Sequence, residues 1–352
     1  MTDQQIQHIG LTCAYTPLPV IAAAGFAPFR ILPMGDMPDK AGHLLHDNLC
    51  PHVKRVLDRA LDEKLPELAG MVFINSCDAM RRLADAWQNV RPADQVIILD
   101  LPATGDETAI LFYADELRRL AQALAKWSGR AVAEDDLRAA IIDYNKLAEA
   151  LEDLHRRIGK GEIAGGRAKM QELYNFAATH PLKETLANLN TVAAENPPVD
   201  AVDDGVPVYL FGNVMPDPEA FRLIESCGTR IVGDDFCTGS RMFAKMTPSK
   251  TGSVFEQVAR SLLTQPPCAR SFTPQQPGRI ATDVLKQAKS CGARGVICHT
   301  LKFCDPYLAR MPMVREAMRE ANLPLLLLEG DCTLRSMGQQ RTRIEAFIEM
   351  LR

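Results

Sequence analysis

The stretch AGMVFINSCDAMRRLADAW, residues 69–87, joins a strand pattern to a helix pattern with one cysteine between them. Its first half is a continuous run of apolar residues, which is typical of a β-strand covered on both faces. Its second half spaces apolar residues as a helix does, beginning near Asp78. Strands that run directly into helices build doubly wound parallel sheets. The stretch therefore predicts an α/β fold, with Cys77 at the end of a strand.

Six further apolar runs end in polar or Gly-rich loops and are predicted strands. They are Phe29–Asp36, Asp94–Pro102, Val206–Asn213, Thr229–Cys237, Gly295–Cys304 and Leu323–Cys332. The runs form two groups, one before residue 105 and one after residue 205, and helical patterns separate the members of each group. This arrangement predicts two doubly wound parallel-sheet lobes.

A region without strand patterns lies between the two groups, from Asp106 to about Ala201, and is rich in Ala, Leu, Glu, Lys and Arg. Its apolar residues follow helical spacing, and Gly129 is a predicted helix stop. The segment Glu195–Pro207 is rich in Pro and Asp and reads as a linker. We therefore expect an N-terminal α/β lobe at 1–105, a helical region and linker at 106–204, and a C-terminal α/β lobe at 205–352.

The composition is that of a folded globular protein, with 352 residues, 47% hydrophobic and 24% charged. The net charge is −4 and the basic residues are dispersed, which argues against a nucleic-acid partner. The longest apolar runs, such as Leu323–Leu328, are far shorter than the ~20 residues of a membrane helix. The N-terminus also lacks a signal pattern. We expect a cytoplasmic protein with no membrane partner.

The chain has ten cysteines, which is an unusual supply for a protein that does not need disulfides to fold. Cys50, Cys77 and Cys304 share one local pattern, in which a polar loop leads to the cysteine and a helix follows. At a helix N-terminus the dipole and the free N–H groups favour the thiolate, which is the form that binds metal. In proteins built on open parallel sheets, bound molecules also lie just outside the carboxyl ends of the strands.

The remaining cysteines and the absence of several motifs exclude other kinds of metal-binding and nucleotide-binding site. Cys227, Cys291 and Cys298 have apolar surroundings and are expected to pack in the core, and Cys13 is an open case that leans towards packing. No close Cys-x-x-Cys pair occurs, so a zinc ribbon or a ferredoxin motif is not supported. The sequence also lacks a P-loop and a Rossmann fingerprint. A metal site would have to be assembled from distant loops of both lobes.

Five segments resemble the 2-hydroxyacyl-CoA dehydratase and benzoyl-CoA reductase family, including its double-cubane cluster proteins. The segments occur in the same order as in the family and are spread over nearly the whole chain. They are TCAYTPLPVIAAAGFAPFRI (12–31), MVFINSCDAMRRLADAW (71–87), IVGDDFCTGSR (231–241), GVICHTLKFCDPY (295–307) and GQQRTRIEAFIEML (338–351). The resemblance implies two flavodoxin-like lobes with a helical part.

The resemblance also implies a 4Fe-4S cluster in the cleft between the lobes, with ligands at Cys50, Cys77 and Cys304. Three cysteines would leave one iron open to water or to the carbonyl of an acyl-CoA thioester. A separate ATP-hydrolysing iron–sulfur activator would deliver a low-potential electron and create a ketyl radical, which permits elimination or ring reduction. The partner subunit would be an identical chain or a paralogue. No proton-transfer residue is assigned.

The double-cubane branch of the family implies two more ligands, which match Cys237 and Cys268. A further cysteine is expected two places after Cys268, and this chain has Arg270 there. Because of that difference, the chain would hold either a single cluster or a variant of the double-cubane cluster in which another side chain is the missing ligand, with Cys332 as a candidate. Two alternative functions stay open: a double-cubane-type reductase of small molecules without CoA, and a non-catalytic two-lobed subunit that lacks a cluster.

Overall fold

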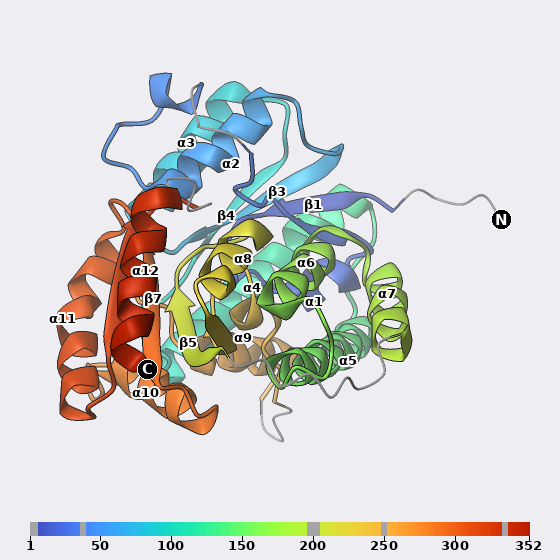
Figure 1. The fold of residues 1–352 in the computed structure, drawn as a ribbon. Coiled ribbons are helices and arrows are strands. Elements are labelled where there is room, and N and C mark those ends of the chain that lie inside the picture. The colour runs from blue at the N-terminus through green and yellow to red at the C-terminus, as the bar shows by residue number, and fades with distance from the viewer. Residues whose placement is uncertain (1–5, 36–39, 196–204, 248–251, 333–336) are drawn as a thin grey trace.

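The first half of the chain forms a parallel four-stranded sheet in the computed structural model, which describes residues 6–35, 40–195, 205–247, 252–332 and 337–352 (Figure 1). The strand order is β2-β1-β3-β4, and all three pairings are parallel. The bounds of the strands are β1 His8–Leu11, β2 Ala27–Arg30, β3 Leu68–Asn75 and β4 Val96–Asp100. Three helices and one 3-10 turn connect them: α1 Leu18–Ala23, η1 Ala41–His43, α2 Pro51–Leu61 and α3 Asp78–Val90.

The second half repeats this topology with the order β6-β5-β7-β8, again all parallel. Its strands are β5 Val206–Gly212, β6 Thr229–Asp235, β7 Gly295–Leu301 and β8 Leu325–Gly330. Its helical elements are α8 Pro218–Ser226, η2 Ser240–Phe243, α9 Val254–Thr264, α10 Arg279–Ser290, α11 Asp305–Glu320 and α12 Met337–Leu351. The expected pair of doubly wound parallel sheets is confirmed.

Four helices lie between the two sheets in sequence and confirm the helical middle region. They are α4 Glu107–Ser128, α5 Glu134–Gly159, α6 Gly166–Thr179 and α7 Leu182–Glu195. Gly129 ends α4 with a φ of 70°, a left-handed conformation that glycine adopts without the steric cost of a Cβ. The expected linker falls largely at 196–204, outside the described residues. The domain limits at 105 and 204 stay predictions.

Two details of the first sheet differ from the expectation. The strand expected at Phe29–Asp36 spans Ala27–Arg30, and of the expected range only residues 29 and 30 are in it. Ile31 still donates its N–H to Leu11 O at 2.8 Å, but the chain then meets Pro33, which has no N–H to continue a ladder. Strand β1 was not expected, because its four residues, His8–Leu11, are too short to give a clear apolar run.

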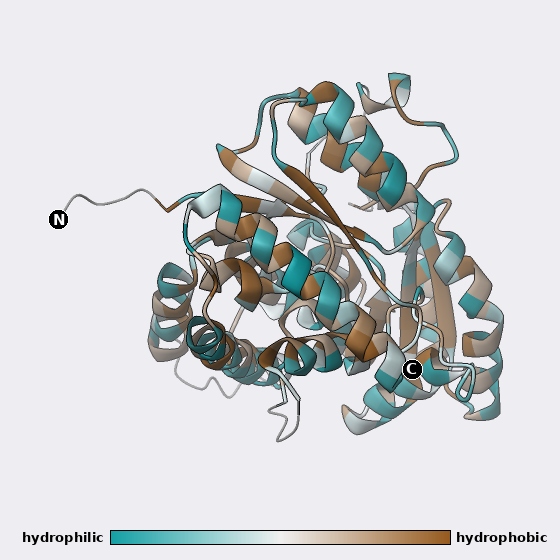
Figure 2. Cartoon of the chain, turned by 180° about the vertical axis from the view of Figure 1, so that it is seen from behind, coloured by the Kyte–Doolittle hydropathy of each residue, from teal (hydrophilic) through white to brown (hydrophobic). Residues whose placement is uncertain are grey.

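Each sheet is covered by helices on both faces, which explains the apolar strands visible in Figure 2. In the first lobe α2 and α3 pack on one face, while α1 and α4 pack on the other. In the second lobe α8 and α12 cover one face, and α10 and α11 cover the opposite one. Helix α9 follows β6 in the chain but packs against α4, so the helical middle shares a core with both halves.

None of the helices in the described part of the chain has the length and apolar character that spanning a bilayer requires.

Candidate metal centre

Five cysteines lie just beyond the carboxyl ends of strands. They are Cys13 after β1, Cys77 after β3, Cys237 after β6, Cys304 after β7 and Cys332 after β8. In each lobe the first and third strands of the chain are neighbours, but the helices that follow them cover opposite faces of the sheet. Loops diverge at such a switch point and leave a crevice for a ligand. The cysteines therefore gather where the fold favours binding.

Cys50, Cys77 and Cys304 each occupy the N-cap position of a helix, α2, α3 and α11 respectively. Pro51 follows Cys50 in the first helical position, where the missing N–H costs nothing. Cys304 is the N-cap of α11, and Asp305 is the first residue of that helix. The structure thus places all three thiols at helix N-termini, as the sequence pattern indicated.

The helix N-termini do not by themselves hold these thiols as thiolates. Burial raises the pKa of the Cys50 thiol to about 12 and that of Cys304 to about 11, and it also raises the pKa of Cys77. The nearby N–H groups of Val53, Met80 and Tyr307 act in the opposite direction but are outweighed. The helix ends thus favour the thiolate as expected, but desolvation of the charged sulfur costs more.

The three thiols lie near one another although they come from both lobes. After burial and a backbone N–H, the next influences on the pKa of Cys50 are Cys77 and Cys304, which raise it. Cys77 likewise raises the pKa of Cys304. In the described residues no three His, Cys, Asp or Glu side chains converge tightly enough for a single metal ion. A four-iron cluster has a wider spacing, because each cysteine binds a different iron.

An ion pair between the lobes fixes the loop that carries Cys50 relative to the second sheet. Arg55 on α2 is 1% exposed, and its Nε donates to Asp331 Oδ1 at 2.8 Å. Asp331 directly follows β8 and precedes Cys332, which is fully buried. Because a buried cation must keep its partner, this pair holds the two halves in one arrangement.

Cys237 and Cys268 form a second group, and Cys13 joins it. All three belong to or pack against the same core cluster. After burial, the largest influence on the pKa of Cys13 is Cys237, and with Cys268 also contributing the value rises to about 12. The pKa of Cys237 is instead lowered, because burial is overcome by the guanidinium groups of Arg30 and Arg241. No pattern in the sequence predicted those two arginines beside a thiol.

Arg270 occupies the position where a further cysteine was expected, and it binds backbone. Its Nε donates to Ser76 O at 2.9 Å and its Nη1 to Pro102 O at 2.6 Å, while its Nη2 donates to Leu101 O. These carbonyls follow β3 and β4 in the first lobe. Arg270 therefore attaches the Cys268 loop next to Cys77, a contact that spacing in the sequence does not reveal.

Three of the other cysteines, Cys227, Cys291 and Cys298, have core surroundings, whereas Cys332 lies beside Cys237 and Cys304. Cys227 and Cys298 are buried in the two cores of the second lobe. The Cys291 thiol donates to Ala288 O at 3.3 Å at the end of α10. Cys332 is enclosed with Val214 and Leu301, and both Cys237 and Cys304 pack against this group. The packing expected for Cys227, Cys291 and Cys298 agrees with these surroundings.

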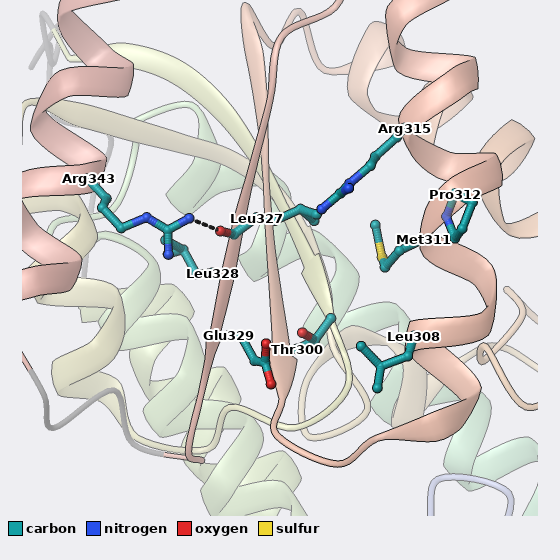
Figure 3. A pocket seen from close by; sticks show the side chains of 9 residues that line it. All are labelled: Thr300, Leu308, Met311, Pro312, Arg315, Leu327, Leu328, Glu329 and Arg343. Carbon is teal, nitrogen blue, oxygen red and sulfur yellow. Dashed lines mark hydrogen bonds between the residues drawn. The ribbon is translucent and has the colours of Figure 1, made fainter.

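A pocket of about 400 Å³ lies beside the edge strand β8, between α11 and α12 (Figure 3). Arg315 and Arg343 flank Leu327, and Arg343 Nη2 donates to Leu327 O at 2.6 Å. Leu308 and Met311 give the pocket an apolar wall. No cysteine lines it, so the chemistry of its lining does not make it the metal centre.

His299 on β7 makes the stability of the second lobe sensitive to acid. Burial lowers its pKa from 6.5 to about 4. Below pH 6.5 the unfolded chain binds a proton that the folded chain does not, so the free energy of unfolding falls as the pH drops towards about 4. At pH 5 the cost of keeping His299 neutral is about 2 kcal/mol.

The free energy of unfolding, measured with urea, should fall between pH 7.5 and pH 5. We expect this fall to be about 2 kcal/mol smaller in His299→Leu than in the parent protein. The exposed His43→Gln should behave like the parent protein. Equal acid sensitivity in all three proteins would show that His299 does not titrate in this way.

The donor set of Cys50, Cys77 and Cys304 fits an iron–sulfur cluster. Sulfur ligands suit iron–sulfur clusters and soft metals. The free N–H groups of the three helix N-termini are donors of the kind that tunes such centres. Nothing in this set resembles the hard oxygen ligands that calcium or magnesium require.

Comparison with known proteins gives consistent matches. A family model described as HGD-D, 2-hydroxyglutaryl-CoA dehydratase, D-component, matches residues 13–351. The chain is 24% identical to the (R)-phenyllactyl-CoA dehydratase beta subunit of Clostridium sporogenes, over 97% of this chain and 91% of that protein. It is 26% identical to a benzoyl-CoA reductase subunit of Thauera aromatica, over 92% of this chain and 85% of that protein. It is 25% identical to (R)-2-hydroxyglutaryl-CoA dehydratase, subunit beta, of Acidaminococcus fermentans, over 97% and 92%.

Proposed function

The chain belongs to the 2-hydroxyglutaryl-CoA dehydratase D-component family, and from this premise we propose that it is the iron–sulfur subunit of an enzyme that dehydrates or reduces an acyl-CoA. The observation that supports the proposal is that Cys50, Cys77 and Cys304, from both lobes, each occupy a helix N-cap and influence one another's pKa. Its relatives include both dehydratase and reductase subunits, so the reaction type within the family is left open.

Cys50, Cys77 and Cys304 would hold a 4Fe-4S cluster. When bound, this cluster supplies one-electron chemistry at low potential. The chain contributes the three sulfurs, the N–H groups of α2, α3 and α11, and an enclosure in which Cys50 is 9% exposed. Because three thiols ligate three of the irons, water or the substrate would provide the remaining ligand.

The proposed partners are an ATP-hydrolysing iron–sulfur activator and a second subunit. Several relatives are named as the beta subunit of a dehydratase, which supports an assembly of two different or two identical chains. The activator would supply the low-potential electron. The substrate would be an acyl-CoA.

A double-cubane-type reductase that works without CoA is the second candidate, because Cys237 and Cys268 lie together beside buried arginines. A non-catalytic two-lobed subunit without a cluster is the third. The first two differ in the iron bound per chain, which would be about four or about eight atoms respectively. The third would bind none.

The test is anaerobic purification with iron and sulfide supplied, followed by electron paramagnetic resonance of the reduced protein. We expect a brown protein whose resonance signal changes when a 2-hydroxyacyl-CoA is added, because the substrate would bind beside the centre. Addition of free CoA is the matched control. Colourless protein would support the non-catalytic subunit, and a signal that no acyl-CoA alters would favour the reductase without CoA.

A further inference from the structure

We propose that Asn213 is a positioning residue for Cys304, and that its side-chain amide donates a hydrogen bond to the Cys304 sulfur. The amide thereby stabilises negative charge on that sulfur, both in the free thiolate and in a ligand of the proposed centre. For the bound centre this role rests on the proposed function, whereas for the free thiol it concerns the chain alone. Asn213 directly follows β5 and is 8% exposed.

Asn213 joins the carboxyl ends of three neighbouring strands, β6, β5 and β7. Its backbone oxygen accepts the N–H of Cys237, which lies beyond β6, at 2.8 Å. Its side-chain Oδ1 accepts the N–H of Leu301, the last residue of β7, at 3.2 Å and the N–H of Val214 at 3.1 Å. Because two backbone donors hold Oδ1, turning the amide over would lose both hydrogen bonds, and Nδ2 is left as a donor.

The turn that carries Cys304 begins at Leu301. The N–H of Cys304 donates to Leu301 O at 3.3 Å, and the N–H of Lys302 donates to Gly330 O at 2.9 Å. Phe303, inside the turn, has a φ of 59°, a conformation that bulky residues rarely adopt. Such a strained turn persists only where its surroundings fix it. The backbone that leads to Cys304 is therefore held in one position relative to the Asn213 amide.

The Cys304 sulfur is within reach of that amide. Cys304 packs against the group that contains Val214 and Leu301, the two residues whose N–H groups hold Asn213 Oδ1. Burial raises the pKa of the Cys304 thiol to about 11, while the Tyr307 N–H and a hydrogen bond from the Asn213 side chain lower the pKa. An N–H donor stabilises a thiolate more than a neutral thiol, so loss of the amide should disfavour charge on this sulfur.

The first experiment uses the full chain without iron, kept reduced. Mass spectrometry of the peptide that contains Cys304 follows its alkylation by iodoacetamide at pH 9. Asn213→Asp keeps the acceptor for Leu301 and Val214 but removes the N–H donor. Loss of that donor should raise the pKa of Cys304 by about one unit or more, an effect that the greater nucleophilicity of a more basic thiolate partly offsets. We therefore expect alkylation of Cys304 to be about threefold slower, or more, in Asn213→Asp.

Two further variants separate the loss of the donor from the added charge. Asn213→Ala removes the donor without adding charge and should also slow the alkylation of Cys304. Asn190→Asp, at an exposed position on α7, adds the same charge and should react like the parent protein. Circular dichroism identifies a variant that fails to fold, and the other Asn213 variant then provides the result. Alkylation of Cys304 as fast in the folded Asn213 variants as in the parent would overturn the hydrogen bond.

The second experiment measures the reduction potential of the chain loaded with iron and sulfide, by anaerobic titration with electron paramagnetic resonance. Hydrogen bonds to ligand sulfurs favour the reduced, more negative form of an iron–sulfur centre. Loss of the amide in Asn213→Ala should shift the equilibrium towards the oxidised form about tenfold, which is ~59 mV for a one-electron couple. The iron content should equal that of the parent, because Asn213 is not a ligand.

The two experiments distinguish the role of Asn213 from the proposed function. A centre that forms with the same potential in the parent and in Asn213→Ala would overturn the effect on the bound ligand and leave the proposed function intact. A parent protein that binds no iron would overturn the proposed function. In that case the alkylation of Cys304 still decides whether Asn213 donates to its sulfur.

Discussion

Cys77→Ala and Cys304→Ala are each expected to give folded protein that has lost the iron–sulfur centre proposed at Cys50, Cys77 and Cys304, about four iron atoms per chain. A cluster held by three protein thiols depends on each of them for assembly, so removing one should prevent binding and not merely slow a reaction. The broad visible absorption of iron–sulfur charge transfer and the counted iron and sulfide measure the loss.

The same substitutions should leave the helices in place, because neither thiol makes a capping hydrogen bond to its helix. Cys291→Ala is the matched control, since it removes a half-buried thiol at the end of α10, away from the centre. Its iron content and absorption should equal those of the parent protein. If Cys77→Ala or Cys304→Ala retains all of the iron of the parent protein, the substituted cysteine is not a ligand.

Arg167→Met is expected to lower the free energy of unfolding by about 3–5 kcal/mol. Arg167 on α6 is 2% exposed, and it donates from Nε to Ile231 O at 2.9 Å and from Nη2 to Val232 O at 2.8 Å. Its Nη1 lies 3.7 Å from the buried carboxylate of Asp234. The substitution leaves two carbonyls and a carboxylate without this cation, and it detaches the helical middle from β6.

Urea unfolding of the parent and the variant measures the change. Lys169→Ala, on the same helix but half-buried and 3.8 Å from Glu172, should alter the free energy of unfolding by less than about 1 kcal/mol. Adding Asp234→Asn to Arg167→Met should recover part of the loss, because it removes a buried carboxyl that would otherwise keep only His155 Nε2, at 3.2 Å, as a nearby partner. A loss in Arg167→Met no larger than that of Lys169→Ala would show that the buried cation contributes little.

Much of the fold was predictable because it depends on local patterns. Continuous apolar runs identified seven of the strands, and helical spacing identified the middle region. The runs are long where both faces of a strand are covered, so burial leaves a clear mark in the sequence. Strand β1, at His8–Leu11, has only four residues and gave no such mark. The end of β2 was misplaced because Pro33 stops the ladder while the apolar pattern continues.

The candidate centre was only partly predictable. Cys50, Cys77 and Cys304 were identified from a local pattern and from the family resemblance, and the structure places each at a helix N-cap. For Cys13 the sequence favoured a packing role in the core, because nothing in its local sequence distinguishes it from a core thiol. Its position beside Cys237 and Cys268 depends on the packing of loops that are far apart in the chain.

The sequence by itself determined the class of fold, the order of its elements and the supply of thiols at strand ends, since these follow from neighbours along the chain. Only the tertiary structure decided which thiols meet, and that buried Arg30 and Arg241 accompany Cys237. It also decided how far burial raises the pKa of Cys50, Cys77 and Cys304. A helix N-terminus is visible in a sequence, but the desolvation that outweighs it depends on every segment that covers the sulfur.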